Sequence, residues 1–148
     1  MSEIIRPITA DDRTGWDELW AGYLEFYKTN LSSEQTELTW SRLLDDEHGI
    51  HGLVADIDGE LLGFAHFSFT HSTWAENQDL YLEDLFVSKT ARGQGIGKAL
   101  ILSLDAIALE EGSSKVWWET QNHNVKARKL YDSVAELSEF VKYVRAVN

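Results

Sequence analysis

The feature that most constrains this sequence is a short glycine-rich segment at residues 90–100, TARGQGIGKAL. Its three glycines alternate with other residues and lead directly into an apolar, helix-forming run. Such a segment exposes backbone N–H groups at the start of a helix, where the helix dipole also favours negative charge. It therefore predicts a strand, a tight loop and a helix in that order, with an anion such as phosphate bound at the loop.

Two common phosphate-binding loops do not match this segment. A dinucleotide fingerprint starting at Gly93 would need a third glycine where Lys98 stands, and it belongs after the first strand of its fold. A P-loop needs Ser or Thr after its lysine, whereas Ala99 follows Lys98 and offers no hydroxyl for magnesium. The spacing that remains is Arg92-x-x-Gly95-x-Gly97.

The rest of the chain predicts alternating strands and helices around the loop. Asp58-Gly59 is a two-residue hairpin signal between two apolar runs, and Asn124 is a good helix N-cap. The expected order is β-α-α-β-β-β-α-β-α-β. Strands are expected at 4–8, 52–57, 60–70, 80–87, 115–120 and 140–145, and helices after Thr9, after Ser32, from the glycine loop to Gly112, and over 124–134.

Composition narrows the class of protein. The 148 residues suit a single domain, 1–148, and 25 acidic against 13 basic residues give a net charge of −12. Because nucleic-acid binding needs a basic surface, this charge argues against it and favours a cationic partner such as an amine. The sequence has no cysteine and no zinc-like histidine spacing, so no metal is expected. With no signal peptide and no bilayer-length apolar run, we expect no membrane contact and a cytoplasmic protein.

Three motifs in sequence order carry a family resemblance: YLEDLFV at 81–87, the Arg92-x-x-Gly95-x-Gly97 loop, and Asn124-x-x-Ala127-Arg128-x-Leu130-Tyr131. Together they resemble the GCN5-related N-acetyltransferase (GNAT) family over about residues 53–131. WAGYLEFYKTNL at 20–31 and HGLVAD at 51–56 are similar to the polyamine/diamine and fungal histone/polyamine branch, which includes D-amino-acid acetyltransferases. The chain departs from the family after Tyr131, where the usual glycine–phenylalanine pair is absent and the path of the last strands stays open.

The resemblance implies an α/β GNAT-type acyl-CoA N-acyltransferase fold, a mixed central sheet flanked by helices. It implies acetyl-CoA as co-substrate and acetyl transfer to a small primary amine (a polyamine, a lysine-like or an amino-acid substrate) by direct attack in a ternary complex. Two alternatives stay open: a non-catalytic acyl-CoA sensor of the same fold, or a protein or peptide acceptor. A homodimer is also compatible with the family.

The resemblance also assigns residues to the cofactor. The backbone of the strand end would pair with the pantetheine arm, the N–H of Val87 would polarise the thioester carbonyl, and the loop would hold the pyrophosphate. The expected cofactor-binding residues are Leu85, Phe86, Val87, Arg92, Gly93, Gln94, Gly95, Ile96, Gly97, Lys98 and Asn124.

Glu83 and Asp84 are two carboxylates in an otherwise apolar strand, where an unpaired charge is costly. The strand period of two predicts that they face opposite sides, with Glu83 the first choice for general base and Asp84 the second. His66 and His71 are less favoured bases on the neighbouring strand.

Tyr131 lies two helical turns beyond Asn124 and is expected to protonate the leaving thiolate. Glu25, Tyr27, Trp74 and Asp84 are the expected substrate-binding residues.

Overall fold

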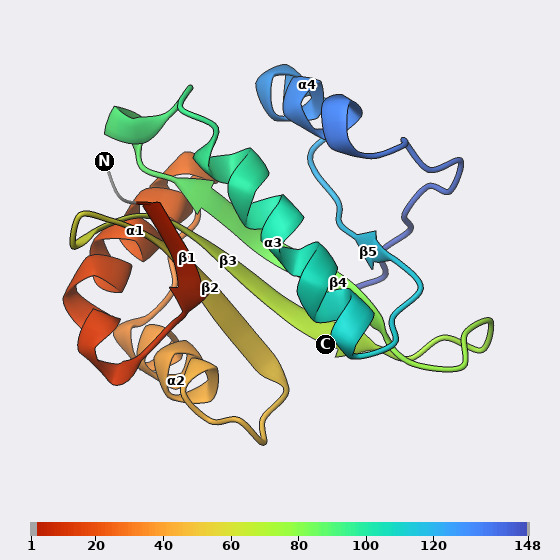
Figure 1. Cartoon of the computed structure of the whole chain (residues 1–148), viewed down its shortest axis with the longest axis horizontal. Coiled ribbons are helices and arrows are strands. Elements are labelled where there is room, and N and C mark those ends of the chain that lie inside the picture. Colours follow the sequence, from red (N-terminus) through yellow and green to blue (C-terminus); the bar gives the residue numbers. More distant parts are fainter. Residues whose placement is uncertain (1–2, 148) are drawn as a thin grey trace.

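The computed structural model describes residues 3–147, which form a mixed sheet with helices on both faces (Figure 1). The strands are β1 (Glu3–Pro7), β2 (Ile50–Ile57), β3 (Glu60–Thr70), β4 (Asp79–Val87) and β5 (Val116–Trp117). The helices are α1 (Arg13–Phe26), α2 (Ser33–Leu43), α3 (Ile96–Glu110) and α4 (Val125–Val134), with 3-10 turns η1 (Ala10–Asp12) and η2 (Lys89–Ala91). The expected α/β class with a mixed central sheet is confirmed.

The strands lie in the order β1-β2-β3-β4-β5. The first four are antiparallel, and β5 pairs in parallel with β4 at only two positions, Leu80 with Val116 and Tyr81 with Trp117. Within the described residues, β4 beyond Tyr81 therefore has no strand on its β5 side. This leaves the carboxyl-terminal half of β4 open toward α3 and α4.

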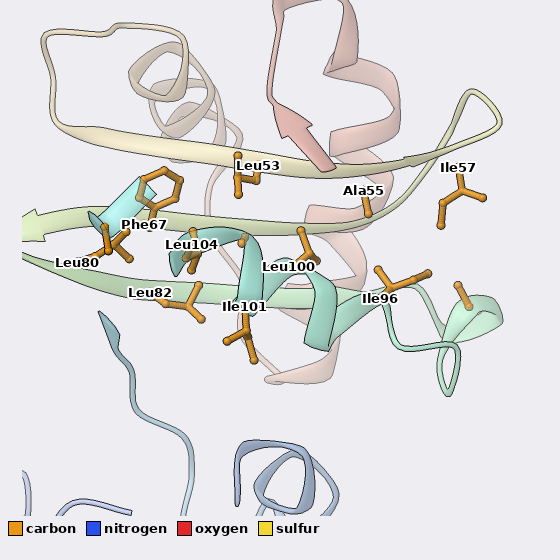
Figure 2. Packing of buried hydrophobic residues seen from close by; sticks show 13 residues of the cluster. Leu53, Ala55, Ile57, Phe67, Leu80, Leu82, Ile96, Leu100, Ile101 and Leu104 are labelled. Carbon is orange, nitrogen blue, oxygen red and sulfur yellow. The ribbon is translucent and has the colours of Figure 1, made fainter. Parts of the chain in front are cut away.

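Two hydrophobic clusters fill the two faces of the sheet. One lies between the sheet and α3, where Ile96, Leu100 and Leu104 are buried against inward side chains of β2, β3 and β4 (Figure 2). The other lies under α1 and α2, around the fully buried Trp16 and Phe64. Because successive β3 residues point to opposite faces, Phe64 and Ala65 belong to different clusters.

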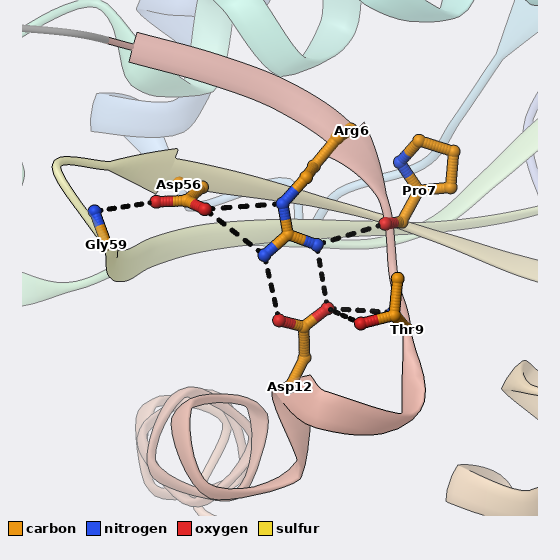
Figure 3. Close-up of polar contacts among 6 residues, drawn as sticks. All are labelled: Arg6, Pro7, Thr9, Asp12, Asp56 and Gly59. Carbon is orange, nitrogen blue, oxygen red and sulfur yellow. Dashed lines mark hydrogen bonds and ion pairs between the residues drawn. The ribbon is translucent and has the colours of Figure 1, made fainter.

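Arg6 of β1 ties three early elements together (Figure 3). Its guanidinium donates to both carboxylate oxygens of Asp12, each at 2.9 Å, and to Oδ2 of Asp56 in β2 at 3.2 and 3.3 Å. Asp12 also accepts from the backbone N–H of Thr9 at 2.7 Å, and Asp56 from that of Gly59 at 2.9 Å. These bonds fix the chain's turn from β1 into α1 against the β2–β3 hairpin.

Two predicted strands differ from the structure. The strand expected at 115–120 is only β5, Val116–Trp117, and residues 140–145 form no strand. Both segments have strand-like composition, but a strand needs a neighbouring backbone to complete its hydrogen bonds. The tail leaves Phe140 and Tyr143 82% and 92% exposed, so its alternating pattern does not reflect burial on a sheet here.

Among residues 3–147, no helix is long and apolar enough to cross a bilayer. The cytoplasmic location stays a prediction.

Candidate active site

A cavity of about 370 Å³ lies beside the open half of β4, between the glycine loop, the start of α3 and α4. All predicted cofactor residues except Gln94 line it, together with the predicted acid Tyr131. The sequence analysis missed five further lining residues, namely Phe26, Ala91, Lys126, Ala127 and Leu130. Ala127 and Leu130 belong to the motif that starts at Asn124, which could have indicated them. The apolar positions Phe26 and Ala91 are equally typical of core packing, and no signal in the sequence distinguishes Lys126.

The loop in this cavity has a backbone that only glycine adopts easily. Gly93 and Gly95 have φ angles of 82° and 81°, in the left-handed region, and Gly95 is the N-cap of α3. A Cβ built on either one would meet no atom within 4 Å, so the space above the loop is open. The first N–H groups of α3 have no partner within the helix and are available to an anion in that space.

Arg92 braces the wall of this cavity. Its Nε donates to the carbonyl of Val87 at 3.1 Å, and its guanidinium lies 5.4 Å from the centre of the Phe86 ring and 5.7 Å from that of Phe26. The side chain thus joins the end of β4 to the loop while keeping its charge at the cavity.

A second cavity of about 550 Å³ lies on the other face, between α1, α2 and the middle of the sheet. Glu83 and Asp84 line it, and Tyr27 lines both this cavity and the first. Its other lining residues are Trp20, Tyr23, Leu24, Thr29, Leu31, Gln35, Thr39, Arg42, His48, Ile50, His66 and Phe67. The two spaces therefore share a wall at Tyr27.

The opposite-face prediction for Glu83 and Asp84 is wrong. In the β3–β4 ladder His66 pairs with Asp84 and Phe67 with Leu82, so Glu83 is an extra residue with no partner across the ladder. Such a bulge breaks the alternation of side chains, because two residues on one strand face one on the other. As a result both carboxylates line the second cavity.

A chain of hydrogen bonds holds Asp84. It accepts from the hydroxyl of Tyr23 at 2.6 Å and contacts Nδ1 of the buried His66 at 2.9 Å, while Nε1 of Trp16 donates to Nε2 of His66 at 3.1 Å. An indole N–H can only donate a hydrogen bond, so Nε2 of His66 must accept it. The ring proton of His66 is therefore on Nδ1, which donates a hydrogen bond to Asp84. His66 is therefore a neutral, fully engaged imidazole that positions Asp84, and it has no lone pair left to act as a base.

The surroundings shift the pKa values of Glu83, Tyr27 and Tyr131. Burial and the neighbouring charge of Asp84 raise the pKa of Glu83 above its ordinary value, which makes it a stronger base. Burial, with a smaller effect of Tyr27, raises the pKa of Tyr131 to about 12, so its phenol stays protonated at neutral pH. Burial and Asp84 likewise raise the pKa of Tyr27.

Besides Gln94, three further predicted residues line neither cavity. Glu25 lies on the exposed side of α1, and Trp74 is 88% exposed on the loop after β3. His71 is exposed and contacts Gln78 through Nε2 at 3.1 Å. Tyr27 and Asp84 alone of the predicted substrate-binding residues line the second cavity.

Comparison with known proteins decides the family. The model of the acetyltransferase (GNAT) family matches residues 16–135. The chain belongs to this family. The GNAT protein is accordingly an acetyl-CoA-dependent N-acetyltransferase, as the sequence predicted.

Individual relatives agree with this assignment. The D-amino-acid N-acetyltransferase HPA3 of Saccharomyces cerevisiae is 33% identical over 144 residues, covering 96% of this chain and 89% of that protein. A solved ribosomal-protein-alanine N-acetyltransferase from Brucella melitensis biovar Abortus 2308 superposes with a TM-score of 0.83 at 26% identity, covering 99% and 100% of the two chains. The aminoglycoside acetyltransferase AAC(6')-Iy, solved with a bisubstrate analogue, shares the fold with a TM-score of 0.86 at 19% identity, with both chains fully covered.

The first cavity of this GNAT protein fits acetyl-CoA. Its open, positive-φ glycine loop can hold the pyrophosphate, and Lys98 and Lys126 add positive charge at the rim. Within the described residues, no strand pairs with the β5 side of β4 from Leu85 to Val87, so backbone groups there can hydrogen-bond an amide-containing arm such as pantetheine.

Proposed function

We propose that this enzyme acetylates the primary amine of a small molecule bound in the second cavity, with Glu83 as general base and Tyr131 as general acid. The observation that carries this proposal is the shared wall at Tyr27, since it brings an amine site and a thioester site to one point. Acetyl-CoA supplies the activated acetyl group, and the chain's own residues bind the amine and move two protons.

In this proposal Asp84 binds the protonated amine and Glu83 removes its proton. A free amine has a pKa of about 10 and arrives mostly protonated, so it must bind as a cation and then lose a proton. Asp84, held by Tyr23 and His66, is suited to attract and orient the ammonium. Glu83, whose pKa is raised, is suited to take the proton directly or through water.

Tyr131 completes the transfer on the other side. As the neutral amine nitrogen bonds to the acetyl carbon, the carbon–sulfur bond breaks and the sulfur takes a proton from Tyr131, while the proton that the new amide nitrogen loses restores the phenol. Tyr131 lines the first cavity, and its ring packs edge-on against Trp118 at 5.5 Å between centroids, which fixes its direction. Its raised pKa keeps the proton available over the whole physiological range.

The acceptor classes to test first are amino acids, lysine-like amines and polyamines. Support for them comes from the acidic floor of the second cavity, from the net charge of −12, and from relatives named for D-amino-acid and thialysine acetylation.

The proposal is tested by measuring CoA release with a panel of small amines and, in parallel, with peptides. We expect turnover with at least one small-amine class and none with a peptide. Turnover confined to peptides would refute the small-molecule acceptor.

We further propose that two copies associate through the C-terminal tail, residues 135–147. The tail leaves six large apolar side chains at least 74% exposed, which is unusual for a monomer surface. They are Leu137, Phe140, Val141, Tyr143, Val144 and Val147. Light scattering should give a dimer for the natural chain and a monomer for the double variant Phe140→Asp/Val144→Asp, and a monomeric natural chain would refute the proposal.

A further inference from the structure

The residues of α2 that line the second cavity are polar. A helix face that packs on the core would be apolar at these positions. Gln35, Thr39 and Arg42 lie at i, i+4 and i+7, so they share one face of α2, and all three line the cavity. The neighbouring face of the same helix buries Trp40 and Leu43 in the core. A polar stripe beside a buried one indicates that this part of α2 faces a ligand space instead of packing on the sheet.

In the part of the chain that the structure describes, the guanidinium of Arg42 has no carboxylate partner, although the protein has many acidic residues. Within residues 3–147, no hydrogen bond or ion pair engages its guanidinium, although the side chain is half-buried. By contrast, Arg6, Arg13, Arg92 and Arg128 all bond to carboxylates or to carbonyl oxygens. In a chain with 25 acidic residues, a half-buried guanidinium without a carboxylate points to an anion supplied from outside.

The charges of the cavity are arranged at two ends. Glu83 and Asp84 stand on β4, while Arg42 and His48 belong to α2 and the segment that follows it. Because α2 packs over β2, and β2 is two strands from β4, Arg42 and the two carboxylates reach the cavity from different elements across the sheet. The side chains reach inward from both ends, which leaves room for a molecule with a cation at one end and an anion at the other.

We propose that the acceptor of this enzyme is an amine that also carries a carboxylate, and that Arg42 binds this carboxylate while Glu83 and Asp84 receive the amine. A guanidinium offers two parallel N–H donors that match a carboxylate, which gives orientation as well as attraction. Polyamines, which carry no anion, would then leave Arg42 unpaired and place a cation near it. This inference rests on the proposed acetylation of a small amine in the second cavity.

The test compares acceptors that differ only in the carboxylate. Amino acids would be paired with their carboxamides, and ω-amino acids with diamines of equal chain length, at saturating acetyl-CoA. We expect kcat/KM to favour the carboxylate-bearing member by at least tenfold, mainly through KM. Carboxamides or diamines used as well as the acids would overturn the inference and leave small-amine acetylation standing, whereas no turnover with any small amine would refute both.

Variants of Arg42 then assign the effect to this residue. Arg42→Gln should remove the tenfold preference while changing the rates with carboxamides by less than about twofold, and Arg42→Glu should shift the preference to diamines. Lys115→Gln, which removes a positive charge at an exposed position outside both cavities, is the matched control and should keep the preference. Unfolding curves and CoA titration establish that each variant folds, and a folded Arg42→Gln enzyme that retains the preference would overturn the role of Arg42.

Discussion

At the residue scale, the bulge at Glu83 brings both carboxylates of the proposed amine site to the same cavity. The extra residue sets Glu83 beside Asp84, and the like charge together with burial raises the pKa of Glu83. Asp84 is held in place by Tyr23 and His66 and keeps acceptor sites free, so we propose that it orients the bound cation while Glu83 takes the proton. Under this proposal, two adjacent carboxylates have different roles because their surroundings differ.

The Glu83→Gln variant tests this division. Removing the base should lower kcat/KM by about 10²–10⁴-fold near neutral pH, with a smaller loss at high pH where the amine is already neutral. In the natural enzyme kcat/KM should rise as the pH increases through the raised pKa of Glu83, and the variant should lack this rise. CoA affinity, measured by calorimetry, should stay unchanged, and a loss equal at every pH would assign Glu83 a positioning role instead.

The Tyr131→Phe variant keeps the ring and removes only the proton donor. Because water can replace part of the lost function, we expect kcat to fall at least tenfold, which is the low end of typical general acid catalysis. Packing of the ring against Trp118 should persist, so the melting temperature and CoA affinity should change little. Wild-type kcat, in an assay limited by the chemical step, would make Tyr131 a packing residue.

At the scale of elements, the glycine loop and α3 together form the proposed anion-binding unit. Gly95 is both the residue that reverses the chain and the N-cap that directs the first N–H groups of α3 into the cavity. The end of β4 is fastened to the same unit by the Arg92–Val87 bond. The pyrophosphate site therefore depends on the path of the loop backbone.

Gly95→Ala tests that dependence, with Gly59→Ala as the matched control. Both glycines have positive φ, 81° and 88°, and a Cβ on either meets no atom within 4 Å. Each variant should therefore lose a similar amount of stability, about 1 kcal/mol, through backbone strain. Only Gly95→Ala should weaken CoA binding, by at least tenfold in calorimetry, since Gly59 lies in the β2–β3 turn; equal affinities would refute the pyrophosphate site.

At the scale of the whole molecule, the free energy of unfolding depends on pH through carboxylates that are paired in the folded state. The hydrogen bonds from Arg6, opposed in part by burial, lower the pKa of the buried Asp12 below 3.8. Its stabilising effect is therefore complete above the unfolded pKa and is lost as the pH falls through the lower folded pKa. Arg6 and Asp12 connect β1, η1 and β2, so this loss loosens the support of α1 and the second cavity.

Asp12→Asn should lower the free energy of unfolding at pH 7 by about 1–3 kcal/mol, because it leaves Arg6 partly unpaired. The difference from the natural chain should shrink as the pH falls below 3.8, where the natural Asp12 also becomes protonated. Asp17→Asn, which removes an exposed partner of Arg13, is the control and should cost less than about 1 kcal/mol. Denaturant titrations at several pH values measure both, and a pH-independent difference would show that Asp12 acts through packing alone.

Local signals in the sequence were enough to determine the glycine loop, the Asp58-Gly59 turn and the N-cap at Asn124. Each depends on contacts within a few residues, and the structure confirms all three, including positive φ at Asp58 and Gly59 and the 3.3 Å bond from the N–H of Ala127 to Asn124. The family motifs also predicted most of the lining of the first cavity, because these motifs lie on the same local segments.

Only the tertiary structure decided the second cavity. The bulge at Glu83 is a property of the β3–β4 register, and register depends on the neighbouring strand as well as on the strand itself. The proton position on His66 depends on Trp16, which is 50 residues away, and the free guanidinium of Arg42 depends on what α2 meets across the sheet. Residues 140–145 also show that the sequence pattern alone does not determine a strand. A strand-like pattern becomes a strand only where another backbone completes its hydrogen bonds.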